Sequence, residues 1–218
     1  MRVADEQPLA VGGARARRVY LDQHARIAVL GTCVGVVAAC LLVSRSVWTP
    51  ESAVPSLLRA GGQCLILTGV LGRLWSTLYI GGRKNAALVI EGPYSVTRNP
   101  LYLFSIIGAA GAGLALGSLV AALVLGSVTC FQLRRTARRE QHLLASHFGT
   151  AYAAYARRVP LLWPRLALYR EAEAPRFHPR VLTRALRDSL LFLLVLPIAE
   201  IIDYARAAGG LPRLLPLL

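Results

Sequence analysis

The chain has 218 residues, of which 55% are hydrophobic, and it carries 25 basic against 11 acidic side chains for a net charge of +14. The charges are grouped in blocks between long uncharged runs, as insertion into a bilayer requires, which argues against a soluble domain of this composition. Arginine blocks between apolar runs are typical of cytoplasmic loops and lipid head-group contacts. We therefore expect a bilayer rather than a nucleic acid as the partner.

The sequence gives little support for a metal-binding site or for a catalytic lysine. The four cysteines lie inside apolar runs and the four histidines are scattered, without CxxC, Cys/His or HExxH spacing. We therefore predict no metal site. Lys84 is the single lysine and lies in a polar loop, so a lysine nucleophile is set aside.

The first apolar run, 27–43, carries no charge and is predicted to be a span. The arginines before it, within 1–26, predict a cytoplasmic N-terminus. A second span is predicted over 57–80, where Arg73 is expected to snorkel to the interface rather than serve a function inside the bilayer. A polar loop over 81–98 follows, on the same face as the N-terminus.

The next feature is a charge-free run of 35 residues from Asn99 to Leu133. As a single helix it would be roughly 52 Å long, against a hydrocarbon core of about 30 Å. We therefore predict two helices, joined by a hairpin turn near Leu116 among glycines that also allow close helix packing.

Arginines return after this run, and the segment from Arg134 to about Arg187 is expected to be interfacial or cytosolic. A last apolar stretch, 189–202, is short and contains Pro197, so we predict a short or re-entrant span. The fold class is therefore all-α, an integral membrane bundle of about four or five transmembrane helices with a helical hairpin and a cytoplasmic C-terminal helical region.

One carboxylate stands out in that cytoplasmic region. A helix is predicted over 133–148, with its arginines on one side and apolar residues such as Ala137 and Phe148 on the other. Glu140 falls on the apolar side, where a carboxylate is costly unless a cation or hydrogen-bond donor meets it. A structural salt bridge to a nearby arginine would serve, and Arg98, at the cytoplasmic mouth of the hairpin, is the natural distant partner.

Short motifs in a fixed order carry a family resemblance. They are EGPY at 91–94, RNPLY at 98–102, the helical hairpin, REQ at 139–141 with Leu144, FGTAY at 148–152, Tyr155, and VP at 159–160. Each motif is weak alone. Their order over residues 91–160 resembles the isoprenylcysteine carboxyl methyltransferase and phospholipid methyltransferase superfamily of integral membrane enzymes.

This resemblance implies a membrane-embedded methyltransferase that uses S-adenosylmethionine, bound by the cytoplasmic helical region. The acceptor would be a membrane-resident molecule with an isoprenylcysteine-like carboxylate, a lipid amine or a thiol. Arg98 and Glu140 are the implied catalytic residues. The implied cofactor contacts cluster at the mouth of the hairpin: Tyr94, Arg98, Asn99, Pro100, Tyr102, Glu140, Gln141 and Tyr152.

Three positions depart from the family pattern: Asn99 replaces a histidine, Phe104 a glycine, and Gln141 a second glutamate. Asparagine still forms hydrogen bonds but cannot become cationic, and glutamine removes a negative charge. These changes support the alternative, a catalytically inactive member that acts as a structural or lipid-binding membrane protein. Phe104 is expected to fill space that a lipid chain would otherwise enter.

The resemblance also suggests how the chain is divided. We expect a cytoplasmic N-terminal segment (1–26), a membrane methyltransferase-like domain (27–170) and a C-terminal extension with a short apolar helix (171–218). The protein would be multi-pass in a bacterial inner membrane, with the site loops in the cytoplasm and a lipid or lipidated acceptor as partner.

Overall fold

The computed structural model describes residues 35–36, 44–45, 52–80, 87–171, 179–207 and 215–216. Its elements, in chain order, are β1 (Ser44–Arg45), α2 (Val54–Ile80), α3 (Pro93–Val96), α4 (Pro100–Ala115), α5 (Leu119–Arg158), the 3-10 helix η1 (Leu166–Leu168), α6 (Pro179–Leu193), α7 (Val195–Ala207) and β2 (Leu215–Pro216). The two short strands pair in parallel. The predicted N-terminal segment 1–26 and almost all of the predicted first span 27–43 lie outside the described residues.

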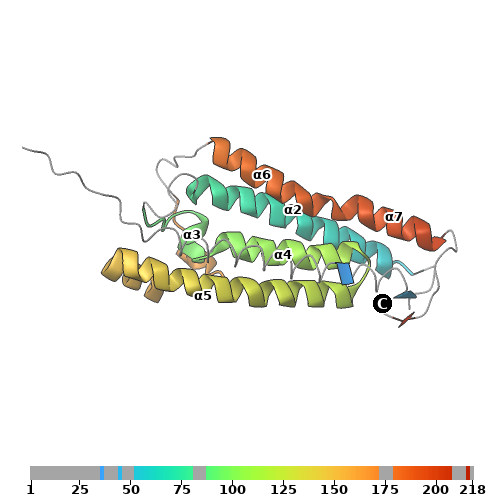
Figure 1. Cartoon of the computed structure of the whole chain (residues 1–218), viewed down its shortest axis with the longest axis horizontal. Helices are drawn as coiled ribbons and strands as arrows, with labels where there is room; N and C mark the ends of the chain where they lie inside the picture. The colour runs from blue at the N-terminus through green and yellow to red at the C-terminus, as the bar shows by residue number, and fades with distance from the viewer. Residues whose placement is uncertain are drawn as a thin grey trace, which may run out of the picture.

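The long helices lie along one another in a bundle, with α4 between α2 and α5 (Figure 1). Glycines bring α2 and α4 into backbone contact. A Cβ added to Gly62 would lie 2.2 Å from the nitrogen of Ala115, and one added to Gly69 would lie 2.9 Å from the Cα of Gly108. A larger residue at either glycine would therefore force the two helices apart.

The predicted hairpin is confirmed. α4 ends at Ala115, the chain turns through Leu116 and Gly117, and α5 begins at Leu119. Gly117 has a φ of 76°, which favours glycine because it has no Cβ. The Ser118 side chain accepts a hydrogen bond from the nitrogen of Ala121 at 3.1 Å and so caps the first turn of α5.

The helix predicted over 133–148 is also confirmed, and it is continuous with the second helix of the hairpin. α5 runs from Leu119 to Arg158, with a kink at Gly149 where φ is 52° and ψ is −124°. Arginine, leucine, alanine, glutamine and glutamate are strong helix formers and no proline intervenes, so nothing in the sequence ends the helix before the kink. One helix therefore carries both the hairpin and Glu140.

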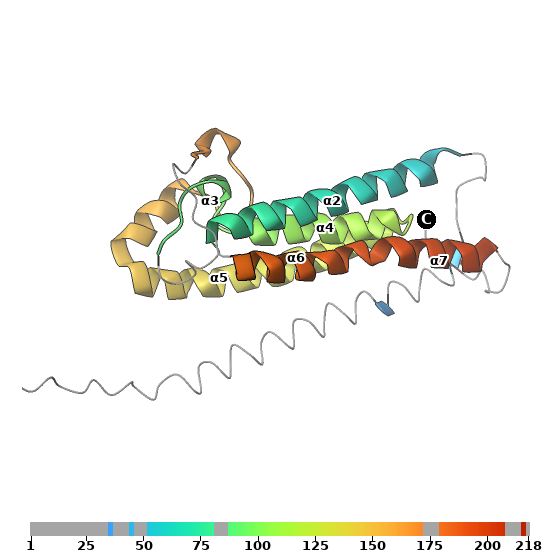
Figure 2. The ribbon, with the colours of Figure 1, turned by 90° about the horizontal axis from the view of Figure 1, so that it is seen from above.

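The apolar stretch 189–202, predicted as a short or re-entrant span, forms the junction of two longer helices. α6 begins well before it at Pro179, and α7 continues beyond it to Ala207. Pro197 falls in the first turn of α7, where a helix tolerates a residue that lacks an N–H donor. Together α6 and α7 lie along α2 and α4 (Figure 2).

Arg73 does not snorkel to the interface, so that prediction is wrong. Its Nε donates to Ser189 Oγ of α6 at 3.3 Å, and its Nη1 donates to Ser105 Oγ of α4. Ser189 is fully buried. The guanidinium stays between the helices because both neighbours offer hydroxyl acceptors there, and it joins α2, α4 and α6.

Two described helices, Val54–Ile80 and Leu119–Arg158, are long and apolar enough to cross a membrane, and Pro100–Ala115 is a shorter apolar helix. Large apolar side chains on the two long helices are exposed, including Leu71 at 57% and Phe131 at 63%. Such surfaces suit lipid rather than water. Apart from the two-residue strands β1 and β2, the described elements are helices. The prediction of an all-α membrane bundle is confirmed, while the number of spans stays a prediction.

Candidate functional site

The turn before α3 requires glycine for two reasons. Gly92 has a φ of 57° and a ψ of −133°, a conformation that side chains rarely adopt. A Cβ at this position would also lie 2.3 Å from a ring carbon of Tyr79. Pro93 follows as the first residue of α3, and its fixed φ suits a helix start. This turn fixes the position of the next residue, Tyr94, at the end of the bundle.

After α5 the chain folds back along the segment that contains α3. We call residues 159–171 the strap. Main-chain hydrogen bonds join the strap to residues 92–98: Arg98 N to Pro160 O (2.9 Å), Arg165 N to Val96 O (3.0 Å) and Gly92 N to Arg170 O (2.7 Å). The strap therefore holds Arg98 in place through its backbone.

Side chains add to this attachment. Thr97 Oγ1 donates to Leu162 O at 3.0 Å, and Asn99 Nδ2 donates to Leu161 O at 3.0 Å. Asn99 thus commits one amide proton to the strap. Pro100 is fully buried as the first residue of α4.

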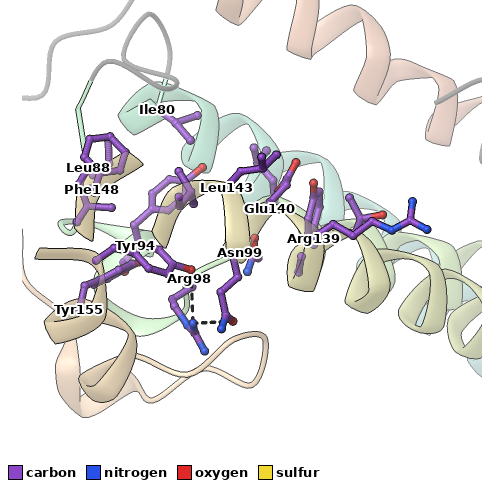
Figure 3. A pocket seen from close by; sticks show the side chains of 18 of the residues that line it. Ile80, Leu88, Tyr94, Arg98, Asn99, Arg139, Glu140, Leu143, Phe148 and Tyr155 are labelled. Atoms are coloured by element: carbon purple, nitrogen blue, oxygen red, sulfur yellow. Dashed lines mark hydrogen bonds between the residues drawn. The ribbon is translucent and has the colours of Figure 1, made fainter. Parts of the chain in front are cut away.

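A cavity of about 450 Å³ lies at this end of the bundle (Figure 3). Its volume falls in the range of roughly 300–1,000 Å³ that is usual for small-molecule sites. Its walls come from the end of α2, the segment 87–102 and α5. The lining residues are Ile80, Ala87, Leu88, Val89, Tyr94, Arg98, Asn99, Leu101, Tyr102, Thr136, Ala137, Arg139, Glu140, Gln141, Leu143, Leu144, Phe148, Tyr152 and Tyr155.

Every residue predicted to contact the cofactor lines this cavity, with the exception of Pro100. Residues far apart in the sequence, from the EGPY motif to the FGTAY motif, therefore share one site. Pro100 lies outside the cavity wall because its role is to start α4 behind it. The structure brings the other predicted residues together.

The expected pairing of Arg98 with Glu140 is not found. Arg98 Nη1 donates instead to Gln141 Oε1 at 3.0 Å and to Tyr152 Oη at 3.5 Å (Figure 3). Neighbouring residues of a helix point about 100° apart, and the strap holds Arg98 on the side of α5 that carries Gln141. Arg98 Nε is buried without a hydrogen-bond partner among the described residues. The guanidinium therefore has one donor that the described residues leave unused.

Glu140 lies on the cavity wall and is half-buried, in agreement with its predicted place on the apolar side of its helix. Ala137, one turn before it, is 1% exposed, and Leu144, one turn after it, lines the same cavity. Among the described residues its carboxylate forms no hydrogen bond or ion pair that would neutralise it. A half-buried carboxylate in this setting favours a cationic ligand.

The hydroxyl of Tyr94 is a second group that points to a ligand. Tyr94 is 5% exposed, and its oxygen is buried without a hydrogen-bond partner in the described part of the chain. Burial raises the pKa of Tyr94 above its usual range, and the nearby Tyr155, Tyr102 and Glu140 raise it further. The hydroxyl is therefore protonated and can donate a hydrogen bond into the cavity.

The kink at Gly149 turns the end of α5 over the cavity and places two tyrosines there. Tyr155 Oη donates to the backbone oxygen of Tyr94 at 2.7 Å, and the rings of Tyr152 and Tyr155 lie 6.1 Å apart at an edge-on angle. A Cβ at Gly149 would meet nothing within 4 Å, so glycine is required by its φ of 52° alone.

Tyr155, Leu88 and Phe148 line the cavity, although the sequence does not predict them as site residues. The spacing of Tyr152 and Tyr155 by three residues, on one face of a helix, is the signal that predicts a shared wall. Leu88 lies in a segment without helical or strand periodicity, so no pattern in the sequence identifies it.

Phe104 does not lie in the cavity wall. Its ring packs directly against the backbone of Gly72, which has no side chain. A Cβ added to Gly72 would lie 2.1 Å from the Phe104 ring. The ring also meets Trp75 edge-on, with ring centroids 6.4 Å apart. The space that Phe104 fills is therefore the interface of α2 and α4.

Among the described residues, no group of three or more His, Cys, Asp or Glu side chains is placed to hold a metal ion. The cavity instead combines one carboxylate, the two guanidinium groups of Arg98 and Arg139, and several tyrosines.

The sequence matches the family model for phospholipid methyltransferases over residues 57–151. It is 38% identical over 206 residues to the cobalt-zinc-cadmium resistance protein CzcN of Cupriavidus metallidurans, covering 94% of each chain. It is 34% identical over 193 residues to the nickel-cobalt-cadmium resistance protein NccN of Alcaligenes xylosoxydans xylosoxydans, covering 88% of this chain and 89% of the relative. No solved structure matches it.

The matched region spans α2, α3, α4 and most of α5, and so includes nearly all of the cavity wall. The two relatives align with the chain over almost its whole length. The motifs, the cavity and the family match therefore agree, and the chain belongs to the isoprenylcysteine and phospholipid methyltransferase superfamily of membrane proteins.

Proposed function

We propose that this chain is a membrane-embedded methyltransferase that uses S-adenosylmethionine and methylates a membrane-resident acceptor. One observation carries the proposal: the family's motif residues, from Tyr94 to Tyr152, converge on a single cavity with unsatisfied polar groups. A purely structural site would have no need to leave these groups unpaired, since burial without a partner costs about 1–3 kcal/mol for each.

The groups in the cavity fit the charges of the cofactor. S-adenosylmethionine carries a sulfonium, an amino group and a carboxylate. Glu140 and the faces of Tyr94 and Tyr152 suit the two cationic groups, and the guanidinium of Arg98 suits the carboxylate. In this proposal Arg98 and Glu140 are the residues on which activity depends, and Tyr102, Asn99 and Gln141 complete the binding wall.

When bound, the cofactor supplies an electrophilic methyl group that passes to a nucleophilic atom of the acceptor. The chain itself orients the reactants and excludes water, which are the main requirements of an in-line displacement. The apolar part of the wall, which includes Leu88, Val89 and Leu101, suits the chain of a lipid or of a lipidated acceptor. The acceptor group would be an isoprenylcysteine-like carboxylate, a lipid amine or a thiol.

We further propose that the cavity faces the cytoplasm of a bacterial inner membrane, where the cofactor is made. The arginine-rich end of α5 supports this orientation, since cytoplasmic loops are enriched in basic residues. The names of the two relatives suggest that methylation by this chain contributes to resistance against cobalt, zinc or cadmium ions.

Cofactor binding by the purified protein in detergent tests the site. Titration calorimetry with S-adenosylmethionine should give saturable binding that Arg98→Ala and Glu140→Ala each weaken by at least about tenfold, the effect of losing one charge-assisted contact. Arg138→Gln is the matched control, because Arg138 is exposed on α5 outside the cavity wall. Equal binding by all four proteins would refute the assignment.

The alternative is a family member that has kept the fold but lost transfer. It is supported by Gln141, which occupies a donor of Arg98 and replaces a family glutamate. Membranes that overproduce the protein should incorporate labelled methyl groups into lipid-extractable or membrane-protein products, and membranes with Arg98→Ala should not. Cofactor binding without incorporation in any fraction would favour the alternative. A deletion strain complemented with either form would then show whether metal resistance follows transfer.

A further inference from the structure

The outer surface of the strap is apolar and aromatic to an unusual degree for a connecting segment. Trp163 is 72% exposed, Leu166 is 77% exposed and Tyr169 is 45% exposed. All three lie within or next to the 3-10 helix η1. Large apolar side chains that are exposed this close together in the chain are typical of a contact site for a protein or a membrane.

The inner side of the strap is rigidly attached, so this exposure is not the result of a loose loop. The strap is bonded to residues 92–98 near both of its ends and in its middle. A further bond runs from the nitrogen of Arg170 to Ser95 Oγ at 3.0 Å. The exposed side chains are therefore held in a fixed arrangement.

The strap also reaches back to the membrane-spanning part of the bundle. Tyr169 lies against Trp75, with ring centroids 6.2 Å apart. Trp75 stands five residues before the end of α2, which is about 8 Å along the helix axis. The exposed face of the strap thus lies beside the last turns of an apolar helix that is long enough to cross a membrane, and the ends of such helices stand where a bilayer meets water.

The charges around this face are mainly positive. Arg157 and Arg158 at the end of α5, together with Arg165 and Arg170 in the strap, are exposed, against two exposed carboxylates beside the strap in the described part of the chain, Glu91 and Glu171. Tryptophan, tyrosine and leucine with flanking arginines are the composition that binds the interface of an anionic bilayer. A protein partner would not require the match in depth to the end of α2.

We infer that the strap is a membrane-interface anchor that binds anionic phospholipid. Trp163, Leu166 and Tyr169 insert at the level of the head groups and upper acyl chains, and the arginines contact lipid phosphates. Because the strap also holds Arg98 and Asn99, this contact places the cavity at a fixed depth relative to the bilayer. The inference does not depend on methyl transfer or on cofactor binding.

Fluorescence of Trp163 in nanodiscs tests the insertion. The full chain with Trp48→Phe and Trp75→Phe leaves Trp163 as the single emitter. In nanodiscs of phosphatidylcholine and phosphatidylglycerol, lipids brominated near the top of their acyl chains should quench its emission strongly, as expected for an interfacial tryptophan. Aqueous acrylamide should quench it weakly. Strong acrylamide quenching with no effect of bromine would place Trp163 in water and overturn the inference.

The anionic preference is tested by placing the bromine on phosphatidylglycerol or on phosphatidylcholine at equal total content. Quenching by phosphatidylglycerol should be stronger, and Arg165→Gln with Arg170→Gln should reduce this preference by roughly fivefold per arginine. The strap's hydrogen bonds use main-chain atoms of these two residues, so the substitutions leave them intact. Arg134→Gln with Arg138→Gln removes the same charge from α5 and should keep the preference.

If both arginine pairs lower the preference equally, general surface charge attracts the lipid and the strap has no specific site, which overturns the anionic part of the inference. If the tryptophan substitutions disturb folding, as shown by lost helical content, the emission of Trp163 is instead obtained as the difference between the unmodified chain and Trp163→Phe. Cofactor binding measured on the same samples reports separately on the proposed function.

Discussion

The Nη1 of Arg98 donates to the Oε1 of Gln141 at 3.0 Å, across the cavity end of α5. Glutamine is neutral, so this contact is a hydrogen bond and not an ion pair. The guanidinium then keeps more of its positive charge unneutralised, which suits the carboxylate of an amino-acid cofactor.

We therefore expect Gln141→Ala to weaken the binding of S-adenosylmethionine by roughly ten- to a hundredfold, since Arg98 loses a hydrogen bond worth about 1.5–3 kcal/mol. Gln141→Glu should retain the contact as an ion pair and bind within a few-fold of the unmodified chain. Titration calorimetry on detergent-solubilised protein measures both. If alanine binds as well as glutamine, Gln141 does not position Arg98.

Tyr94 provides a test that separates stability from binding. Its buried hydroxyl has no partner among the described residues, so Tyr94→Phe should leave the free energy of unfolding unchanged or raise it by about 1 kcal/mol. The same change should weaken cofactor binding, because the donor in the cavity is lost. Tyr155→Phe is the contrasting variant. It removes a bond of 2.7 Å to the Tyr94 backbone and should lower thermal stability.

Tyr94 also predicts a dependence of stability on alkaline pH. Burial raises the pKa of its hydroxyl in the folded chain above the unfolded value, which is about 10. Above pH ~10 the unfolded chain loses this proton while the folded chain keeps it, so the free energy of unfolding falls as the pH rises. Tyr94→Phe should flatten that fall in thermal unfolding experiments. An identical alkaline slope in both proteins would contradict the burial of the hydroxyl.

The adjacent glycines Gly61 and Gly62 form a matched pair for the contact between α2 and α4. A Cβ at Gly62 would lie 2.2 Å from a backbone atom of α4, whereas a Cβ at Gly61 would meet nothing within 4 Å. Gly62→Ala should destabilise the protein by about 1–3 kcal/mol through overpacking. Gly61→Ala should be neutral or stabilise it by about 0.4–1 kcal/mol. Thermal unfolding of the two variants in the same detergent compares them directly.

Gly149 is expected to be intolerant for a different reason. No atom blocks a side chain there, so Gly149→Ala tests the backbone conformation alone. Adopting φ 52° and ψ −124° should cost alanine about 1–3 kcal/mol. If the kink straightens instead, Tyr152 and Tyr155 leave the cavity and cofactor binding is lost. Thr150→Ala, an exposed neighbour, is the control and should preserve both stability and binding.

The sequence predicted those features that follow from patterns along the chain. The charge-free run and its glycines gave the hairpin turn at Leu116, and helical periodicity gave the place of Glu140 on the apolar side of its helix. The partner of Arg98 could not be predicted in this way. The position of Arg98 depends on its attachment to the strap. That attachment uses main-chain atoms, which every residue has, so no residue pattern in the sequence indicates it.

Patterns in the sequence also do not predict where the side chain of Arg73 is bonded, or that the apolar stretch 189–202 joins two longer helices. An arginine near the end of a span snorkels unless a neighbouring helix offers acceptors, and Ser189 comes from a helix far along the chain. Pro197 reads as a helix breaker in sequence, yet it is harmless in the first turn of α7. Both outcomes depend on which helices meet, and a single sequence does not state this.

The continuity of α5 has a mechanical consequence. Its first part lies against α4 in the apolar bundle and its second part carries Glu140 and Gln141, with no flexible joint before the kink at Gly149. A change in bilayer thickness that tilts the hairpin would therefore also displace these two side chains, because they lie on the same continuous helix far from its start. The strap fixes Arg98 from the opposite side, so the width of the cavity would report the thickness of the surrounding membrane.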